Sequence, residues 1–327
     1  MRVFRDTLAI HLSDIPKSVV ALGTFDGVHL GHREILRRCA ARGRQENLPS
    51  VVFTFHKHPL EIIRPQFAPQ LLTDIPDKLT LIQGLGIENT VIAQFDDEMA
   101  RATPEEFVRE ILVDSLRAKW VVAGFNYTFG RKAEGNAETL KSLGEKYGFS
   151  VEIAKPVSVG GTPVSSTRIR SSLTKGNVEE ASMMLGRPFS IKGKIIKGES
   201  RGKTLGYPTV NLDVPREIAL PKCGVYAASV CVKGCMFGAV TNVGTRPTFS
   251  GETMSVETHI IGFEGNLYGE ILRVFLAKRL RDEIKFSSGE ALTYQISQDV
   301  ERAKEILGNW SLCDQVFAIS EDASQGA

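Results

Sequence analysis

The chain has 327 residues, of which 42% are hydrophobic and 24% charged, a composition typical of folded globular domains and not of disordered proteins. Its formal net charge of +2 excludes the strong positive field that general nucleic-acid binding requires, so we expect no nucleic-acid partner. The length exceeds that of a typical single core and predicts two domains.

Cysteine usage and hydropathy indicate the compartment. The five cysteines are scattered without a C-x-x-C pair, an odd and unpatterned set that fits a reducing environment better than a disulfide framework or a zinc site. The N-terminus lacks the apolar segment of a signal peptide, and no stretch approaches the roughly 18 apolar residues of a membrane span. We therefore predict a cytoplasmic protein with no membrane association and no obligatory protein partner.

The first half of the chain alternates strand and helix signals. Apolar runs without polar alternation suit a parallel sheet covered on both faces, and they lie at Ser18–Gly23, Val51–Phe55, Thr90–Phe95 and Trp120–Phe125. Helical patterns lie between them, the clearest starting at Thr103, with Pro104 at the first helical position and Glu106 closing a capping box. We expect a doubly wound α/β sheet, in which ligands bind beyond the carboxyl ends of the strands.

The segment GTFDGVHLGH, residues 23–32, follows the first of these runs. Its glycines allow the backbone to approach a ligand closely, and a helix that begins near Gly31 directs free N–H groups to the same place, where they attract phosphate. His29 and His32 can donate hydrogen bonds there. A helix-capping turn with two surface histidines is the alternative, and the segment is no P-loop because Gly-Lys-Ser/Thr does not follow.

Two later segments of the first half can also hold phosphates. SSTRIRSS, residues 165–172, places hydroxyls and two arginines at a helix start, with an ordinary N-cap as the alternative. GFNYTFGRKAEG, residues 124–135, follows a strand and supplies Asn126, with a plain polar loop as the alternative. In TFHKHP, a metal site at His56 and His58 is conceivable, but we favour a loop on the phosphate side of the site.

The sequence pattern changes at Arg187–Phe189. From Ser190 onward, short β runs separated by glycine turns predict a small antiparallel barrel. A last helix begins near Ser288, with Leu292, Ile296, Val300, Ala303 and Leu307 on one face. We place the domain boundary after residue 186, which gives domains of residues 1–186 and 187–327, with a frayed polar tail after about residue 310.

The barrel sequence opens with a candidate phosphate flap, GKIIKGESRGKTLGYPTVNL, residues 193–212. Strand alternation places Thr209 and Asn211 on one face, and their neutral oxygens could hold a Mg²⁺ ion that is carried mainly by the phosphates of ATP. A glycine-rich hairpin with a Thr/Asn edge is the alternative. The candidate phosphate contacts in the flap are Gly198, Gly202, Lys203 and Gly206.

In order, GTFDGVHLGH, TFHKHP, FNYTFG and SSTRIR resemble the adenylyltransferase half of the bacterial bifunctional riboflavin kinase/FAD synthetase family, over about residues 15–186. Lys57 stands where that family more often has proline. The H-x-G-H signature alone also resembles the wider nucleotidylyl-transferase superfamily, which includes class I aminoacyl-tRNA synthetases. Chain length, the missing anticodon-binding sequence and the neutral charge exclude a synthetase.

This resemblance implies transfer of AMP from ATP to FMN, giving FAD and pyrophosphate. It implies that His29 and His32 stabilise charge on the ATP phosphates and that Asn126 helps to hold the metal–phosphate group. Ser166, Thr167 and Arg170 would contact the phosphates that leave, whereas Arg168 occupies a variable position and receives no role. The candidate ATP contacts in the first motif are Gly23, Phe25, Asp26 and Gly31.

The second half resembles the flavokinase signature G-x-x-x-G-x-x-x-G-[FY]-P-T-x-N, followed in the family's order by TNVGTRPTF and VETHI, over about residues 188–307. The resemblance implies transfer of the γ-phosphate of ATP to the 5′-hydroxyl of riboflavin, with Glu257 as general base. A lone glutamate in a strand is otherwise usually a solvated residue. Arg281 would face the flavin phosphate or the nucleotide, or else form a surface ion pair with Asp282 or Glu283.

Together these motifs predict a bifunctional enzyme that uses ATP and Mg²⁺ in both steps, with riboflavin, FMN and FAD as its flavin substrates and products. An alternative enzyme keeps the kinase but gives the first half another phosphate ester as acceptor. A non-enzymatic alternative is a flavin-responsive binding module with decayed sites. Both motif sets are complete, including Glu257 and the His29–His32 pair, which argues against decay.

Overall fold

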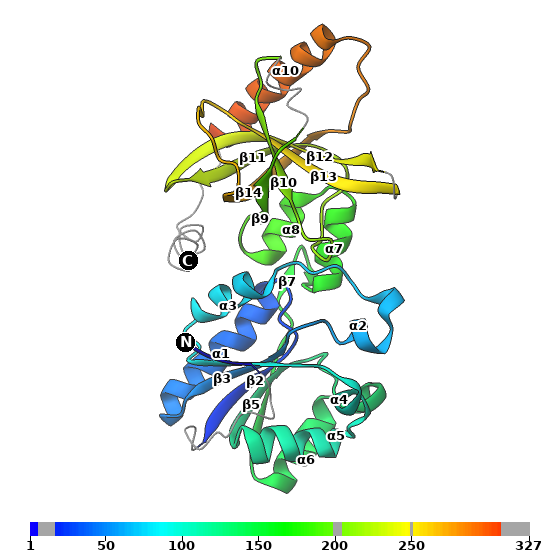
Figure 1. Ribbon diagram of the computed structural model, residues 1–327. Helices are drawn as coiled ribbons and strands as arrows, with labels where there is room; N and C mark the ends of the chain where they lie inside the picture. The colour runs from blue at the N-terminus through cyan, green and yellow to red at the C-terminus, as the bar shows by residue number, and fades with distance from the viewer. Residues whose placement is uncertain (6–16, 199–204, 249–250, 309–327) are drawn as a thin grey trace. The chain divides into compact units, whose positions relative to one another are not determined.

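The computed structural model describes residues 1–5, 17–198, 205–248 and 251–308. The chain divides into two compact units, Met1–Ser166 and Thr167–Ala327, each of which is described by itself (Figure 1). The tail after residue 310 and the candidate residues Gly202 and Lys203 lie outside the described residues. Within the described ranges, no helix is long and apolar enough to span a membrane.

A six-stranded parallel sheet with the strand order β1-β4-β3-β2-β5-β6 forms the first unit. Every residue of β2 and β4 is buried, which explains why these strands read as apolar runs without alternation. The strands are β1 Arg2–Arg5, β2 Ser18–Leu22, β3 Ser50–Phe55, β4 Asn89–Ala93, β5 Ala118–Gly124 and β6 Ser150–Ala154. The prediction of a doubly wound α/β sheet is confirmed.

Helices cover both faces of this sheet. Val20 and Leu22 of β2 join an apolar cluster with Phe107 and Leu140, whereas Val19 and Ala21 join a second cluster with residues of α1. The main helices are α1 Leu30–Glu46, α3 Ile75–Gln83, α5 Pro104–Phe107 with a π-helical continuation Val108–Ser115, and α6 Ala137–Tyr147. Shorter elements are α2 Leu60–Ile63, η2 Pro65–Phe67, α4 Asp97–Arg101, η4 Arg131–Ala133, β7 Ser158–Val159 and β8 Thr162–Pro163.

The strand order reverses between β2 and β5. From β2 the chain adds β3 and β4 on one side, and β5 and β6 then follow on the other side. In sheets of this kind, ligands bind outside the carboxyl ends of the strands at this point. The segment Gly23–His32 leaves β2 here, and the segment that contains Asn126 leaves β5.

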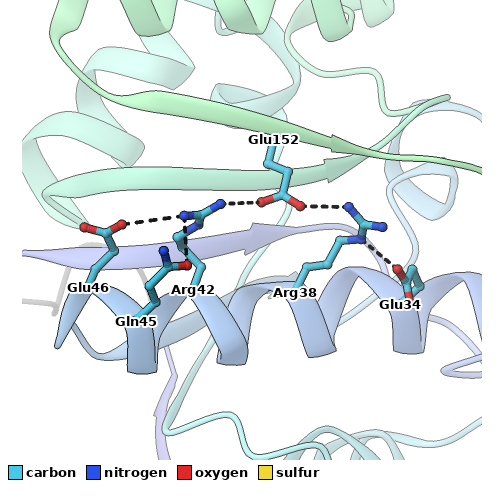
Figure 2. Close-up of polar contacts among 6 residues, drawn as sticks. All are labelled: Glu34, Arg38, Arg42, Gln45, Glu46 and Glu152. Carbon is cyan, nitrogen blue, oxygen red and sulfur yellow. Dashed lines mark hydrogen bonds and ion pairs between the residues drawn. The ribbon is translucent and has the colours of Figure 1, made fainter.

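Glu152 anchors α1 to the edge strand β6 (Figure 2). Its two carboxylate oxygens accept hydrogen bonds from Arg38 Nη1 at 2.8 Å and from Arg42 Nη2 at 3.4 Å. The same arginines form ion pairs with Glu34 and Glu46 of α1. Each partly exposed pair contributes at most about 1 kcal/mol, and it is the two pairs with Glu152 that bind α1 to the β6 edge.

A closed antiparallel barrel with the strand order β10-β13-β12-β11-β14-β9 dominates the second unit. Its strands are β9 Phe189–Ile196, β10 Thr209–Asp213, β11 Gly224–Val232, β12 Cys235–Thr248, β13 Gly251–Ile260 and β14 Ile271–Arg281. The long helix α10, Gly289–Gly308, packs on the barrel through Val300 and Ala303, which are buried with Val225 and Ala227 of β11. The predicted mainly-β barrel with a C-terminal helix is confirmed.

The helices α7, Ser166–Thr174, and α8, Val178–Leu185, precede the barrel and contact it. Ser182 Oγ accepts a hydrogen bond from the N–H of Phe189 at 3.0 Å, and Glu179 lies 3.2 Å from Lys278 of β14. The N–H of Lys222, between β10 and β11, donates to the Leu173 carbonyl of α7 at 2.9 Å, so both helices pack with the second unit. The predicted division of the two activities after residue 186 stays a prediction.

Arg281 links β14 to α10. Its Nε and Nη2 atoms donate to the carboxylate of Asp299 at 3.0 and 2.7 Å, and Asp299 is only 5% exposed. Arg281 Nη1 donates to the backbone carbonyl of Asp282 at 3.0 Å. The Asp282 carboxylate accepts a hydrogen bond from Arg279 Nη2 at 2.6 Å instead. Of the two alternatives for Arg281, a surface side-chain pair with Asp282 or Glu283 is not formed, and the arginine pairs with the buried Asp299 instead.

We expect Asp299→Ala to lower the free energy of unfolding of the second unit by about 3 kcal/mol, because it leaves a largely buried guanidinium without its carboxylate. Hydrogen exchange of the barrel amides in increasing urea measures this loss. Lys304→Ala is the matched control on the same helix, since it breaks only the exposed pair with Glu301 and should cost less than about 1 kcal/mol. Equal losses in the two variants would contradict a structural role for the Arg281–Asp299 pair.

Candidate functional sites

The turn after β2 has a left-handed backbone. The φ angles are +49° at Phe25, +81° at Gly27 and +37° at Val28. Glycine adopts this conformation freely, but each of the other two residues pays about 1–2 kcal/mol for it. Strain of this kind gathers at ligand-binding sites, where the surrounding structure must hold it in place.

His29 caps α1 and thereby orients both imidazoles. Its Nδ1 accepts a hydrogen bond from the backbone N–H of His32 at 3.2 Å, which leaves the proton of the neutral ring on Nε2. The two rings stack with their centroids 3.6 Å apart. Gly31 gives the space for this, because a Cβ there would lie 3.2 Å from His29 Cε1. Two imidazoles thus lie at a helix N-terminus, where anions are stabilised.

Phe25 supports this arrangement from the core. Its ring is fully buried and meets the His32 ring edge-on, with centroids 5.3 Å apart. A Cβ at Gly23 would lie 3.0 Å from Phe25 Cζ, so the glycine makes room for the ring. The structure therefore gives these two residues a part in shaping the turn.

Asp26 and Ser166 tie the turn to other segments. The buried Asp26 carboxylate accepts hydrogen bonds from the N–H groups of Leu72 at 2.9 Å and Thr73 at 3.3 Å. Ser166 Oγ donates to the Asp26 carbonyl at 3.0 Å. The structure thus brings Ser166 to the predicted phosphate turn and assigns the Asp26 side chain to anchoring contacts that the sequence did not indicate.

The other predicted groups of this site are less closely constrained. Asn126 lies just past β5, where its Oδ1 would be 3.4 Å from a Cβ at Gly124. Thr167 and Arg170 follow Ser166 on α7, and their phosphate contacts stay predictions. Arg168 forms an ion pair with Glu180 at 2.8 Å, which agrees with its having no predicted phosphate role.

In the barrel, Asn211 and Glu257 lie opposite each other on β10 and β13, and Thr209 lies opposite His259. Directly opposed residues of antiparallel strands share one face of the sheet. Arg246 of β12 donates Nη2 hydrogen bonds both to Asn211 Oδ1 and to Glu257 Oε1. The structure therefore joins a predicted metal ligand to the predicted base through an arginine.

One glycine of the candidate flap, Gly198, lies beside Asn211. A Cβ at Gly198 would lie 2.0 Å from Asn211 Nδ2, so any other residue there would displace that amide. Gly206 has a φ angle of +82°, which favours glycine in the turn before β10.

The donor set of the barrel suits Mg²⁺. Thr209 and Asn211 offer neutral oxygens and Glu257 a carboxylate, all of which are hard ligands. The Asn211 carbonyl oxygen has two lone pairs, so the bond from Arg246 occupies only one of them. In the described ranges, no three His, Cys, Asp or Glu side chains gather as a metal site. A cation held here needs further oxygens, which the phosphates of a nucleotide can supply.

Sequence reasoning missed two residues of these sites, Arg246 and Lys78. Lys78 of α3 is buried and donates to the backbone carbonyls of Thr24 at 3.1 Å and Phe55 at 3.3 Å. Burial lowers its pKa to about 8. Arg246 lies in the TNVGTRPTF segment, but only the folded barrel shows that it contacts Asn211 and Glu257. No sequence signal marks Lys78.

Comparison with known proteins covers both units. The chain matches the family model of FAD synthetase over residues 12–168 and that of riboflavin kinase over residues 185–307. The bifunctional riboflavin kinase/FMN adenylyltransferase of Escherichia coli K12 is 36% identical over 91% of this chain and 96% of its own length. Its counterpart in Bacillus subtilis 168 is 34% identical over 90% and 93% of the two chains.

Among solved structures, a Streptococcus pneumoniae protein described as a macrolide-efflux protein is 34% identical, with a TM-score of 0.85. The match covers 95% of this chain and 100% of that one, so the two chains share the whole fold.

The two family models occur in the same order as the motifs and fall on the parallel-sheet unit and the barrel. The curated relatives extend over nearly the whole chain and name FMN as the acceptor in the adenylyl transfer, in preference to another phosphate ester. The chain belongs to the bifunctional riboflavin kinase/FMN adenylyltransferase family, whose members phosphorylate riboflavin to FMN with ATP and then convert FMN to FAD with a second ATP.

Proposed function

We propose that two separate sets of residues carry the two reactions, with Glu257, Asn211 and Thr209 serving the kinase and His29, His32 and Arg170 serving adenylyl transfer. The observation that carries the proposal is that Asn211 and Glu257 both bind Arg246 in the barrel. These residues belong to the second unit, whereas His29 and His32 belong to the first. We further propose that the activities divide after residue 186.

Phosphorylation of riboflavin needs a base, because a hydroxyl is a weak nucleophile at neutral pH. Glu257 accepts the proton of the 5′-hydroxyl while the oxygen attacks the γ-phosphorus of ATP, the bond from the γ-phosphorus to the bridging oxygen breaks, and ADP leaves. Thr209 and Asn211 would hold Mg²⁺, which neutralises charge on the transferred phosphoryl group when bound. Arg246 orients the Glu257 carboxylate, and Gly198, Gly202, Lys203 and Gly206 contact the ATP phosphates.

Adenylylation of FMN needs no base, because the FMN phosphate is already an anion. Positioning and charge neutralisation are then the main tasks. His29 and His32 donate to the ATP phosphates at the N-terminus of α1, and Gly23, Phe25, Asp26 and Gly31 shape the turn that brings them there. Asn126 helps to hold a metal–phosphate group, and Ser166, Thr167 and Arg170 contact the leaving pyrophosphate.

We also propose a cytoplasmic enzyme with no obligatory protein partner and no nucleic-acid partner. Three cysteines of the described ranges, Cys39, Cys231 and Cys235, are thiols outside any disulfide, which supports a reducing compartment.

Glu257→Gln should lower riboflavin phosphorylation by about 10²–10⁴-fold, because the amide cannot accept the hydroxyl proton. Conversion of supplied FMN to FAD by the same protein is the internal control and should stay at the native rate. Both rates are measured by chromatography of the flavins. Native phosphorylation by the variant would remove Glu257 from the role of base.

His32→Ala should lower FAD formation from FMN by about 10²–10³-fold, the usual loss for one preorganised donor to a developing charge. The variant should still phosphorylate riboflavin, so FMN accumulates. A native rate of FAD formation would show that the histidines only cap α1.

Gly198→Ala tests the close approach of the flap to Asn211. The added methyl group displaces the Asn211 amide, and we expect riboflavin phosphorylation to fall by about 10–100-fold, since a misplacement of about 1 Å has effects of that size. Gly289→Ala at the start of α10 is the control, because a Cβ there meets only Leu205 Cδ2 at 3.6 Å. Native phosphorylation by Gly198→Ala would separate Asn211 from the kinase site.

A further inference from the structure

Lys78 is a buried cation beneath the turn after β2. Its side chain enters from α3, and the residue is only 6% exposed. The Nζ atom donates to the carbonyl of Thr24, two residues past the end of β2, and to the carbonyl of Phe55, the last residue of β3. One ammonium group thus ties together the ends of two neighbouring parallel strands.

Thr24 directly precedes the left-handed part of the turn. Its carbonyl also accepts a hydrogen bond from Thr54 Oγ1 at 3.0 Å, so two side-chain donors meet on one oxygen. On the far side of the turn, the N–H of Gly27 donates to Thr73 Oγ1 at 3.1 Å. The turn that leads into His29 is therefore held at both ends by side chains from other segments.

The stability of the fold does not by itself require a charge at this position. A buried ammonium costs free energy that its hydrogen bonds and an opposite charge only offset. The lowered pKa of Lys78 reflects this burial, while the carboxylate of Asp26 acts in the opposite direction. An apolar side chain of similar length would avoid this desolvation, but it would remove a donor from the carbonyls of Thr24 and Phe55.

We propose that Lys78 is a positioning residue for adenylyl transfer, which holds the Thr24 carbonyl and thereby sets the turn that presents His29 and His32 to the nucleotide. This inference rests on the roles proposed above for the two histidines. It involves only the parallel-sheet unit, so the kinase activity of the same chain serves as an internal measure of folding.

Lys78→Met in the full-length chain is the decisive variant, because methionine keeps much of the length and removes both the charge and the donors. We expect kcat for conversion of FMN to FAD to fall by about 10²-fold, the loss that a small misplacement of reacting groups produces. The KM for FMN should change little, and riboflavin phosphorylation should not change. The melting temperature should change by only a few degrees, because the loss of a buried charge offsets the loss of its two hydrogen bonds.

Two further variants separate positioning from general stability. Glu152→Ala breaks the ion pairs between α1 and β6 in the same unit (Figure 2), so it should lower the melting temperature and keep kcat. Thr54→Val removes the second side-chain donor to the Thr24 carbonyl without a charge change. It should lower kcat less than Lys78→Met does.

The pH profile gives an independent readout. The Lys78 ammonium loses its proton as the pH rises through about 8, and Asp26 on the turn is the charged group that acts on it. The native kcat for FAD formation should therefore decline above that pH. The methionine variant has no such group, so the ratio of native to variant kcat should shrink as the pH rises.

The proposal is overturned if Lys78→Met keeps the native kcat, or if it loses kcat, melting temperature and kinase activity together. Should Lys78→Met fail to fold, Thr54→Val decides, and a native kcat in that variant overturns the proposal. An error in the roles proposed for His29 and His32 can be told apart from an error in the role of Lys78. It would appear as native FAD formation by His32→Ala, whatever the Lys78 variant does.

Discussion

Backbone hydrogen bonding between strands is the constraint on which both candidate sites depend, because strand register decides which side chains meet. In the barrel, the pairing of β10 with β13 sets Asn211 opposite Glu257, and a slip of one residue would turn one of them to the other face. In the parallel sheet, β2 pairs with both β3 and β5, so the turns that leave these strands gather at one edge. Each site is thereby assembled from segments that are distant in sequence but fixed by the most regular part of the structure.

The two sites differ in what the surrounding protein must supply. The kinase reaction needs a group that accepts a proton, and the group proposed for that role is Glu257, a partly exposed glutamate bound by an arginine that also reaches Asn211. The parallel-sheet unit needs no base and instead holds a strained turn, from which two stacked imidazoles extend at a helix N-terminus. Two buried polar groups fix that turn: the Asp26 carboxylate on the turn binds the N–H group of Leu72, and the Lys78 ammonium binds the Thr24 carbonyl. The strained turn and the buried charges lower the stability of this unit but fix the positions of the two imidazoles. Such a compromise is expected where positioning is the main catalytic task.

The sequence predicted the elements that carry a local signal, such as a run of buried apolar residues or a helix cap. It missed residues whose role depends on a contact with a segment distant in sequence. The apolar runs of β2 and β5 and the capping box at Thr103 are local signals, and the structure confirms all three. The edge strand β6 gives no such signal, because Glu152 interrupts its apolar pattern in order to bind Arg38 and Arg42 of α1. Lys78 resembles an ordinary surface lysine in an amphipathic helix. Only the folded arrangement, which brings its ammonium group to the ends of β2 and β3, shows that it is buried.

The central claim is that one chain holds two independent catalytic sites joined by a released intermediate, FMN. Mixing the Glu257→Gln and His32→Ala proteins with riboflavin and ATP tests it most directly. If the sites are independent, the mixture forms FAD after a lag in which FMN accumulates in solution, and it does so far faster than either protein alone. If each protein keeps its remaining activity but the mixture forms no more FAD than the two separate reactions together, FMN does not pass between the sites as a released intermediate, and the independence of the two sites is contradicted.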